Sequence, residues 1–427
     1  MLGKLVRVRP AALIQVKPAG MVNGPLRLFC DNRRGGFPPM PFRPPSSCPL
    51  CRAIESREVQ TQILALAGLG TVEIGFGYCG ACGHIYQVRP PSAAVLEENY
   101  ANYSNYTCFD AQAARSAPAA ASTRRLISLA QACAPRTGKV YEIGCATGFH
   151  LAHFRRAGRD VAGCDPSPKA KAQAKDVFDI AVDCGFEAEV LPRQSNLAVV
   201  MFSHVLEHLT DPLGALVRAR QALSDDGVVL LEVPCAIAPH QMPPGWFTFE
   251  HLHYFSETSL LRMLNDAGLV PLEMRVAFGQ ELYPVIAVIA RKGKPGAAIG
   301  ASPLHVAQTQ QFLDDLMAHD NALWSNTATR VGGALGRVYV WGAGVHTAQL
   351  FERTPLLQNA DIVGIIDRDN QKWGRRQAGR EIVSPNDFFD RYDDEAVVIS
   401  SFAAEAQIAQ SLADARIAQN RIVRLYG

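Results

Sequence analysis

The chain has 427 residues, of which 48% are hydrophobic, and its formal net charge is +2. This length predicts about two to four domains with sizeable cores. The near balance of charge gives no footprint for nucleic-acid binding, and no apolar run approaches the ~18 residues of a membrane span. We therefore expect a cytoplasmic protein with a small-molecule substrate, with no nucleic-acid or membrane partner.

Basic residues are concentrated at the start of the chain, in residues 1–45, where Asp31 is the only acid. Pro and Gly cluster between Gly35 and Pro45. The segment lacks a compact apolar core with a cleavage site, so it does not resemble a secretory signal. We expect a disordered leader, or a stretch that precedes the true start of the protein.

Two Cys-x-x-Cys pairs follow, Cys48 with Cys51 and Cys79 with Cys82. Two such pairs can present four thiolates tetrahedrally to one Zn²⁺; a redox role is the alternative. Four cysteines leave no open coordination position, so the metal is expected to be structural. We predict a zinc-ribbon-like module over residues 46–95, with too little core to be stable without its metal.

Three tyrosines, Tyr100, Tyr103 and Tyr106, come next at three-residue spacing. They are candidates for a substrate-facing stripe. Their periodicity alone leaves surface stacking equally open.

Residues 120–290 alternate apolar strands with helical periods, which is typical of a doubly wound α/β sheet, within a middle domain expected over residues 96–291. The expected strands are Val140–Ile143, Val161–Cys164, Leu197–Phe202, Val228–Val233, Glu273–Ala277 and Val285–Ala290.

A Glu-x-Gly-x-x-x-Gly motif, made by Glu142, Gly144 and Gly148, ends the first of these strands, and Asp165 and Pro166 end the second. The glycines permit a tight turn and close approach to a ligand, and the aspartate lies where such sheets present a carboxylate to ribose hydroxyls. The motif resembles motif I of class I S-adenosylmethionine methyltransferases. It has fewer glycines than a dinucleotide site, which suits a cationic, phosphate-free nucleoside; an ordinary strand-to-helix turn is the alternative.

Two histidines follow the strand that ends at Phe202, at the sheet edge where ligands bind in such folds. His204 is a candidate for contact with the cofactor and His208 for contact with the substrate. Packing or capping remains an equal alternative for each.

A cluster of polar and aromatic residues contains Glu250 and His251. Imidazole titrates near neutrality and can take a proton at physiological pH. We predict that His251 is a general base and that Glu250 orients it. The alternative is that this segment caps the following helix, with Ser256 as N-cap, and packs against the sheet.

Residues 292–335 are expected to form a linker and a long helix, and residues 336–427 a second, small Rossmann-like domain. In this domain Gly342, Gly344 and His346 lie where a strand turns into a helix. Amides at the start of that helix are candidates for holding a diphosphate. Since Gly-x-Gly lacks its third glycine, a purely structural half-site is the alternative.

The order of these features, over residues 46–427, resembles the three-domain sugar C-methyltransferases that methylate C3 of nucleotide-linked 4-keto deoxysugars. The resemblance implies a structural zinc, S-adenosylmethionine in the middle domain, and sugar-nucleotide contacts from the C-terminal domain. It also implies that His251 is the base, that His208 lies near the keto oxygen, and that one tyrosine of the stripe lines the cleft. A tyrosine of that family falls on Thr248 here, which leaves its role vacant.

The implied chemistry is consistent with the residues. A 4-keto group acidifies the proton on C3, a base removes it, and hydrogen-bond donors stabilise the enolate oxygen. Two alternatives stay open: an O- or N-methyltransferase acting on another sugar or natural product, and a non-catalytic zinc-ribbon scaffold protein. The sequence does not name the sugar, the nucleotide or any protein partner.

Overall fold

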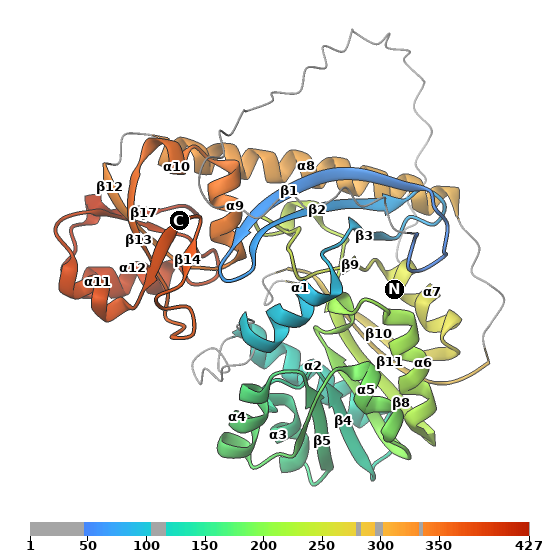
Figure 1. The fold of residues 1–427 in the computed structure, drawn as a ribbon. Helices are drawn as coiled ribbons and strands as arrows, with labels where there is room; N and C mark the ends of the chain where they lie inside the picture. The colour runs from blue at the N-terminus through green and yellow to red at the C-terminus, as the bar shows by residue number, and fades with distance from the viewer. Residues whose placement is uncertain (1–46, 104–116, 279–282, 295–301, 333–335, 427) are drawn as a thin grey trace, which may run out of the picture. The chain divides into compact units, whose positions relative to one another are not determined.

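Three β-sheets organise the chain in a computed structural model that describes residues 47–103, 117–278, 283–294, 302–332 and 336–426 (Figure 1). The predicted leader (residues 1–45) and Tyr106 lie outside the described residues, and Tyr103 is described only in its backbone. Residues 42–427 form one unit, which contains all three sheets. Over the described residues, no helix has the length and apolar character that crossing a membrane requires.

The first sheet is antiparallel and has the strand order β1-β2-β3-β9. Its strands are β1 (Ser56–Leu66), β2 (Gly70–Cys79), β3 (Ile85–Arg89) and β9 (His253–Tyr254). The last strand comes from the middle of the chain, where Tyr254 pairs with Ile85 and His253 with Tyr86. The segment that carries the predicted base is therefore hydrogen-bonded to the cysteine-rich module, a connection that the sequence did not indicate.

The second sheet has the order β10-β11-β8-β7-β4-β5-β6. Its strands are β4 (Lys139–Ile143), β5 (Asp160–Asp165), β6 (Val182–Cys184), β7 (Leu197–Ser203), β8 (Leu223–Pro234), β10 (Leu269–Ala277) and β11 (Val285–Lys292). The strands from β6 to β8 are parallel, whereas β11 runs antiparallel to both β8 and β10. This confirms the expected strands and a doubly wound order. The chain adds β5 and β6 on one side of β4 and β7 and β8 on the other, so the strand order switches between β4 and β7.

Helices cover both faces of the second sheet. They are α2 (Ala117–Cys133), α3 (Phe149–Arg156), α4 (Pro168–Phe178), α5 (Glu187–Val190), α6 (Pro212–Ala222) and α7 (Glu257–Asp266), with the short turns η4 (Leu191–Arg193) and η5 (Leu206–His208). Apolar residues of α2, α3 and α4 pack in one core cluster and those of α6 and α7 in another. Neighbouring residues of one strand divide between the two, with Val140 in the first and Tyr141 in the second. The central strands are therefore buried on both faces, as parallel sheets require.

The third sheet has the order β14-β15-β13-β12-β16-β17 and is parallel except for β14. Its strands are β12 (Arg337–Trp341), β13 (Asp361–Ile366), β14 (Arg376–Gln377), β15 (Arg380–Val383), β16 (Ala396–Ile399) and β17 (Ile422–Arg424). Its helices are α9 (Val345–Arg353), α10 (Leu356–Asn359), α11 (Pro385–Arg391) and α12 (Glu405–Asp414), with the short turn η7 (Gln419–Arg421). The expected alternation of strands and helices in this part of the chain is present.

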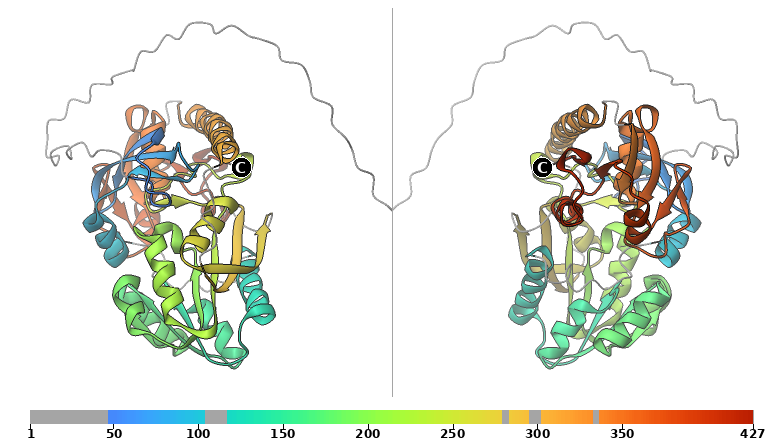
Figure 2. Two further views of the ribbon diagram at one scale, coloured as in Figure 1. Left: turned by 90° about the vertical axis from the view of Figure 1, so that its right-hand side faces the viewer. Right: turned by 90° about the vertical axis from the view of Figure 1, so that its left-hand side faces the viewer.

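The long helix α8 (Pro303–Val331) lies along the hairpin of β1 and β2 (Figures 1 and 2). Tyr78 donates a hydrogen bond to Gln310 at 3.2 Å, and Thr309 donates to the carbonyl of Gly83 at 3.0 Å. Leu313 of α8 belongs to the core cluster of the first sheet. The helix therefore helps to hold that sheet in place.

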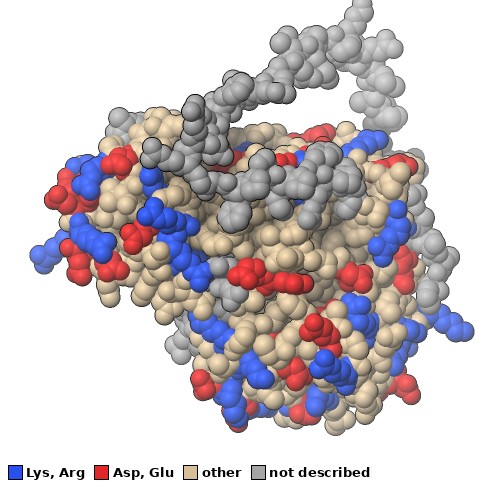
Figure 3. All heavy atoms as spheres, in the orientation of Figure 1, with Lys and Arg blue, Asp and Glu red and all other residues tan. Residues whose placement is uncertain are grey.

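Charged side chains of both signs are interspersed over the described part of the face in Figure 3. Close opposite-sign pairs include Arg89 with Glu58 on the first sheet, and Arg218 of α6 with Glu187 of α5.

Candidate active site

A cavity of about 420 Å³ lies at the carboxyl ends of the parallel strands of the second sheet. This volume falls within the roughly 300–1,000 Å³ of small-molecule sites, and the position is where doubly wound sheets bind ligands. The loops after β4, β5, β6 and β7 all contribute to its wall. The lining includes Gly144, Ala146, Asp165, Pro166, Gly185, Phe186, His204 and His208.

The glycine turn after β4 has the backbone that its sequence predicts. Gly144 and Gly148 have φ angles of +61° and +77°, a region that costs little only for glycine. A Cβ on Gly144 would lie 2.5 Å from Cγ2 of Val205. The turn therefore excludes side chains and leaves its backbone facing the cavity.

The Asp165 carboxylate is 8% exposed and is held by this turn. One oxygen accepts a hydrogen bond from the amide of Ala146 at 2.9 Å, and the other accepts from the amide of Ser167 at 2.9 Å. Burial raises the pKa of Asp165, while the two amides lower it. Since each oxygen has a second lone pair, the carboxylate can still accept from ribose hydroxyls in the cavity.

Glu142 is buried beneath the turn, where one carboxylate oxygen accepts a hydrogen bond from Nδ1 of His150 at 3.0 Å. The other oxygen has no hydrogen-bond partner among the described residues. Burial raises the pKa of Glu142, and His150 opposes that shift. Burial alone would lower the pKa of His150, but Glu142 outweighs it and raises the pKa. Glu142 is not among the residues that line the cavity, so its carboxylate acts on the turn from beneath.

His204 bridges two buried carboxylates from a left-handed backbone with φ of +52°. Its Nε2 lies 3.3 Å from Glu232, and its Nδ1 lies 3.5 Å from Glu207. Glu232 also accepts from Nε of Arg125 at 2.7 Å. Burial would raise the pKa of Glu232, but His204 and Arg125 lower it to about 2. His204 therefore lines the cavity, while its ring nitrogens face protein carboxylates.

The two predicted catalytic histidines are brought together. The rings of His208 and His251 meet edge to face with centroids 4.8 Å apart. Nδ1 of His208 lies 2.9 Å from the hydroxyl of Tyr100 and 3.0 Å from the carbonyl of Glu250. Of the three predicted tyrosines, Tyr100 is thus placed at the cavity, beside His208.

His251 is 9% exposed, and its Nδ1 has no hydrogen-bond partner in the described structure. Burial and the charge of His208 lower the pKa of His251 to about 3. The imidazole is therefore neutral at physiological pH and able to accept a proton. Its low pKa means that the protonated form needs a compensating negative charge.

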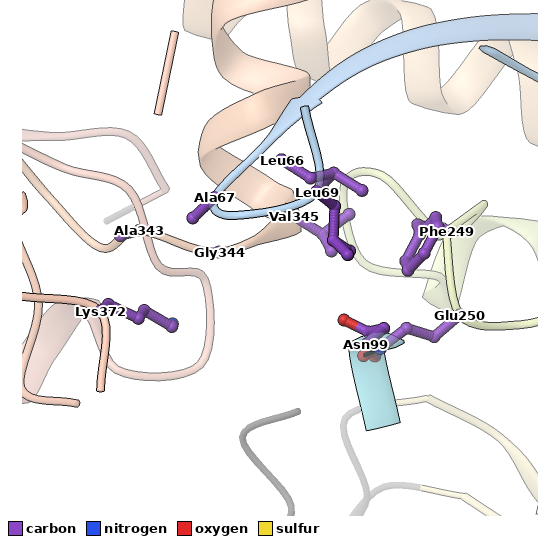
Figure 4. A pocket seen from close by; sticks show the side chains of 10 residues that line it. All are labelled: Leu66, Ala67, Leu69, Asn99, Phe249, Glu250, Ala343, Gly344, Val345 and Lys372. Atoms are coloured by element: carbon purple, nitrogen blue, oxygen red, sulfur yellow. Dashed lines mark hydrogen bonds between the residues drawn. The ribbon is translucent and has the colours of Figure 1, made fainter. Parts of the chain in front are cut away.

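Glu250 does not take the orienting position expected from the sequence. Its carboxylate accepts a hydrogen bond from Asn99 at 2.9 Å and lines a second cavity of about 280 Å³. Figure 4 shows Asn99 and Glu250 together on one side of this cavity and Lys372 on the other. Leu66, Ala67, Leu69, Phe249, Ala343, Gly344 and Val345 complete the lining.

A short π-helical turn, η1 (Asn99–Tyr103), follows α1 (Ala93–Glu98) and separates the two cavities. Asn99 lines the second cavity and Tyr100 the first. The backbone of Glu250 contacts His208, while its side chain faces the second cavity. The two cavities therefore lie on either side of η1.

The C-terminal glycine turn is largely filled by its own protein. Nδ1 of His346 forms a hydrogen bond of 2.9 Å with the hydroxyl of Ser400, and Nε2 forms one with the hydroxyl of Tyr426. A Cβ on Gly342 would lie 2.6 Å from the carbonyl oxygen of Ser400. Of the three predicted residues here, only Gly344 lines the second cavity; Gly342 and His346 pack within the domain.

The four predicted metal-binding cysteines form one cluster whose sulfur atoms all lie within 4.8 Å of one another. The sulfur atoms of Cys48 and Cys82 lie 3.7 Å apart, and those of Cys51 and Cys79 lie 3.5 Å apart. None of the four cysteines forms a disulfide. Tetrahedral thiolates about 2.3 Å from a zinc ion lie roughly 3.8 Å apart. The cluster therefore fits one Zn²⁺.

Several residues of the site were missed by the sequence reasoning. Asn99 and Lys372 reach the second cavity, Phe186 reaches the first, and Glu207 is buried under the histidines. A glycine and an aromatic residue directly after the short strand β6 were a usable signal for Phe186. The polar run from Asp367 to Lys372 after a strand was a usable signal for Lys372. We find none for Asn99 and Glu207, because their neighbours come from distant parts of the chain.

Comparisons with known proteins support the middle of the chain most strongly. A family profile described as a methyltransferase domain matches residues 112–274, and one described as C2185-like, N-terminal matches residues 335–423. The C-methyltransferase NovU of Streptomyces niveus is 30% identical over 164 residues, which cover 36% of this chain and 38% of NovU. The match thus spans less than half of that relative. Residues 112–274 of this chain are therefore a methyltransferase domain.

Solved structures of methyltransferases resemble part of the chain. The TehB-like S-adenosylmethionine-dependent methyltransferase of Corynebacterium glutamicum has a TM-score of 0.32 at 20% identity, covering 40% of this chain and 87% of its own. The 1,6-didemethyltoxoflavin-N1-methyltransferase of Burkholderia thailandensis, solved with S-adenosylhomocysteine, has a TM-score of 0.39 at 18% identity. It covers 49% of this chain and 96% of its own.

Proposed function

We propose that this protein methylates a carbon atom of a nucleotide-activated keto-deoxysugar, using S-adenosylmethionine. The observation that carries this proposal is that two cavities lie next to each other, one lined by Glu250 and the other by Tyr100 and His208. His251 lines neither cavity but packs against the ring of His208. One cavity belongs to the methyltransferase domain, and the other opens toward the C-terminal domain. A reaction between two bound molecules needs such neighbouring sites, because positioning alone removes much of the barrier.

The cofactor is assigned to the first cavity. Asp165 would accept hydrogen bonds from its ribose, and the turn at Gly144 and Gly148 would pass close to it. Glu142 would support the turn from beneath. Pro166 and Phe186 offer apolar walls for the base. S-adenosylmethionine bound there supplies an electrophilic methyl group.

The acceptor is assigned to the second cavity. The wall carries Lys372 at one side and Glu250 with Asn99 at the other. Lys372 also pairs with Asp367 at 3.1 Å, and an anionic end of a ligand would share its ammonium, while a hydroxyl-bearing end would face Glu250 and Asn99. Gly344 would let a phosphate approach the start of α9, where amide groups favour anions. Tyr103 and Tyr106 stay candidates for the same ligand.

A neutral imidazole begins the chemistry. His251 takes the proton next to the keto group, and His208 with Tyr100 donates hydrogen bonds to the oxygen on which negative charge develops. Glu250 then acts on the acceptor or holds η1 through Asn99, in place of orienting His251.

Zinc is assigned to Cys48, Cys51, Cys79 and Cys82 as a structural ion. Those sulfurs belong to the same core cluster as Leu260 and Met263 of α7. The ion would therefore stabilise both the first sheet and the segment that carries His251. We also propose the division into residues 46–95, 96–291 and 336–427 as functional parts.

An O- or N-methyltransferase with the same cofactor site is the alternative function. Methylation of a hydroxyl or amine needs no enolate, so it leaves the buried pair of His208 and His251 without a proton-abstracting role. The two functions differ in the atom that receives the methyl group.

A panel of nucleotide-linked 4-keto deoxysugars tests the proposal. With S-adenosylmethionine, we expect a product whose NMR spectrum places the new methyl group on carbon. In D₂O without the cofactor, the enzyme should exchange the proton next to the keto group. Matched nucleotide sugars without a keto group serve as controls. A methyl group on oxygen or nitrogen, with no exchange at carbon, would favour the alternative.

A further inference from the structure

Glu207 is a deeply buried carboxylate beside the histidines of the first cavity. It lies in η5, directly after β7, and is 1% exposed. Neither of its carboxylate oxygens has a hydrogen-bond partner within the described residues. Burying an unpaired charge is expensive, so the protein must compensate this carboxylate in another way.

The compensation available is a ring of three imidazoles. Oε1 of Glu207 lies 3.5 Å from Nδ1 of His204 and 3.9 Å from Nε2 of His208. A carboxylate oxygen of Glu207 and ring nitrogens of His208 and His251 all lie within 4.8 Å of one another. The carboxylate thus faces both candidate bases at once.

Other charged and titratable groups near this ring are already engaged. Glu232 of β8 contacts His204 from the other side and forms an ion pair with Arg125. Tyr283 packs against His204 with ring centroids 6.2 Å apart. Among the described contacts, Glu207 faces the imidazoles of His204 and His208, with His251 close by. Its charge also acts on the buried His253, whose ring nitrogens contact Leu209 and His84.

We propose that Glu207 is a positioning residue, whose fixed negative charge stabilises the imidazolium formed when His251 takes the substrate proton. The inference rests on the proposed function. In that step the C–H bond breaks, an N–H bond forms on the imidazole, and the electron pair moves onto the keto oxygen as an enolate. The positive charge then appears beside Glu207.

The electrostatics agree with this geometry. Burial would raise the pKa of Glu207, but contact with His204 and the charges of His208 and His251 outweigh it and lower the pKa. Burial and His208 lower the pKa of His251, whereas Glu207 acts in the opposite direction. Without this carboxylate, His251 would be a still weaker base.

The variant Glu207→Gln keeps the shape of the side chain and removes its charge. We expect deuterium exchange next to the keto group to fall roughly tenfold or more, a part of the ~10²–10⁴-fold effect of a general base. The acid limb of its pH profile should move to lower pH, because the imidazole loses a stabilising charge. Glu207→Asp should restore part of the rate, and cofactor affinity should change less than about twofold.

A matched control separates this effect from general destabilisation. Glu395 is also a buried glutamate, but it is paired with Arg337 at 3.1 Å in the third sheet. Glu395→Gln should lower thermal stability without moving the pH profile. If both variants move the profile equally, or neither does, Glu207 is not a positioning residue.

Histidine NMR tests the proposal without any substrate. In protein with labelled histidines, the titration midpoint of His251 should move to lower pH in Glu207→Gln; an unchanged midpoint would overturn the proposal even if the acceptor is misassigned. A bound metal is the competing explanation, since Glu207, His208 and His251 are also possible ligands. A second metal equivalent that is present in the wild type and lost in Glu207→Gln would overturn the proposal too.

Discussion

The second and third sheets carry the same local device with opposite outcomes. In each, a glycine turn follows a central strand, and its amide donates to an aspartate at the end of the neighbouring strand. The amide of Ala146 donates to Asp165 at 2.9 Å, and that of Ala343 donates to Asp367 at 2.8 Å. At this level the two turns are equivalent.

The surroundings of the two aspartates differ. Asp165 faces a cavity of about 420 Å³, and its described hydrogen bonds are to backbone amides. Asp367 is neutralised by the ammonium of Lys372 at 3.1 Å. His346 further fills the C-terminal turn through Ser400 and Tyr426.

This contrast shows that a glycine turn with its aspartate does not by itself make a nucleoside site. A ribose needs an acceptor whose charge is not already matched and space beside it. The second sheet meets both conditions. The third sheet instead contributes Gly344 and Lys372 to the wall of another cavity.

Removing zinc should have the largest effect, and it tests whether the glycine turn of the second sheet, at Gly144 and Gly148, depends on the first sheet. A structural zinc site contributes roughly 10–16 kcal/mol in small zinc-binding peptides, so Cys79→Ser should lose the ion and strongly destabilise the first sheet. Elemental analysis and thermal denaturation measure both. Cys133→Ser, outside the cluster, is the control; a fully folded protein without metal would rule out the structural ion.

Replacing the histidine of each region should separate chemistry from packing. His251→Asn should lower turnover about 10²–10⁴-fold, the usual contribution of a general base. His346→Asn should reduce stability with little effect on the turnover of the folded enzyme. Initial rates and deuterium exchange measure the difference. If His208→Asn is inactive while His251→Asn is not, the two roles must be exchanged.

Replacing the aspartate of each turn should separate the two sites by cofactor affinity. Asp165→Ala should weaken S-adenosylmethionine binding by about 1.5–3 kcal/mol, the range for a hydrogen bond to a charged group. Asp367→Ala should leave that affinity unchanged, because Lys372 already occupies the carboxylate. Isothermal titration measures both variants. Equal losses would mean that the comparison between the turns is mistaken.

Acid should weaken the C-terminal turn through His346, and this is the smallest expected effect. Burial lowers the pKa of His346 from 6.5 to about 4. The unfolded chain then binds more protons than the folded one, so stability present above pH 6.5 is lost as the pH falls toward 4.

His150, in α3 next to the turn at Gly148, should have the opposite effect on stability, because its pKa is raised. Its contribution to stability is present below its unfolded pKa and is lost as the pH rises through its folded pKa. We expect His346→Asn to remove about 1 kcal/mol of the loss between neutral and acidic pH, or roughly 2–4 °C in Tm. Thermal denaturation at the two pH values measures it. Identical acid sensitivity in wild type and variant would contradict the assignment.

The sequence by itself determined the local parts of this protein. Strands β4, β5 and β7, the turn at Gly144 and Gly148, and the N-cap at Ser256 followed from periodicity, glycine and capping residues. These are properties of neighbouring residues, so a few positions suffice to predict them. The pairing of cysteines into one cluster followed from their spacing in the same way.

Only the tertiary structure decided which of these parts face one another. It joined β9 to the first sheet, gave Glu250 to Asn99 and not to His251, and buried Glu207 beneath the imidazoles. It also closed one glycine turn with Lys372 and left the other open. Each of these outcomes depends on contacts between distant segments, and on burial that makes a charge costly unless it is matched. Neither is recorded in the local pattern of residues.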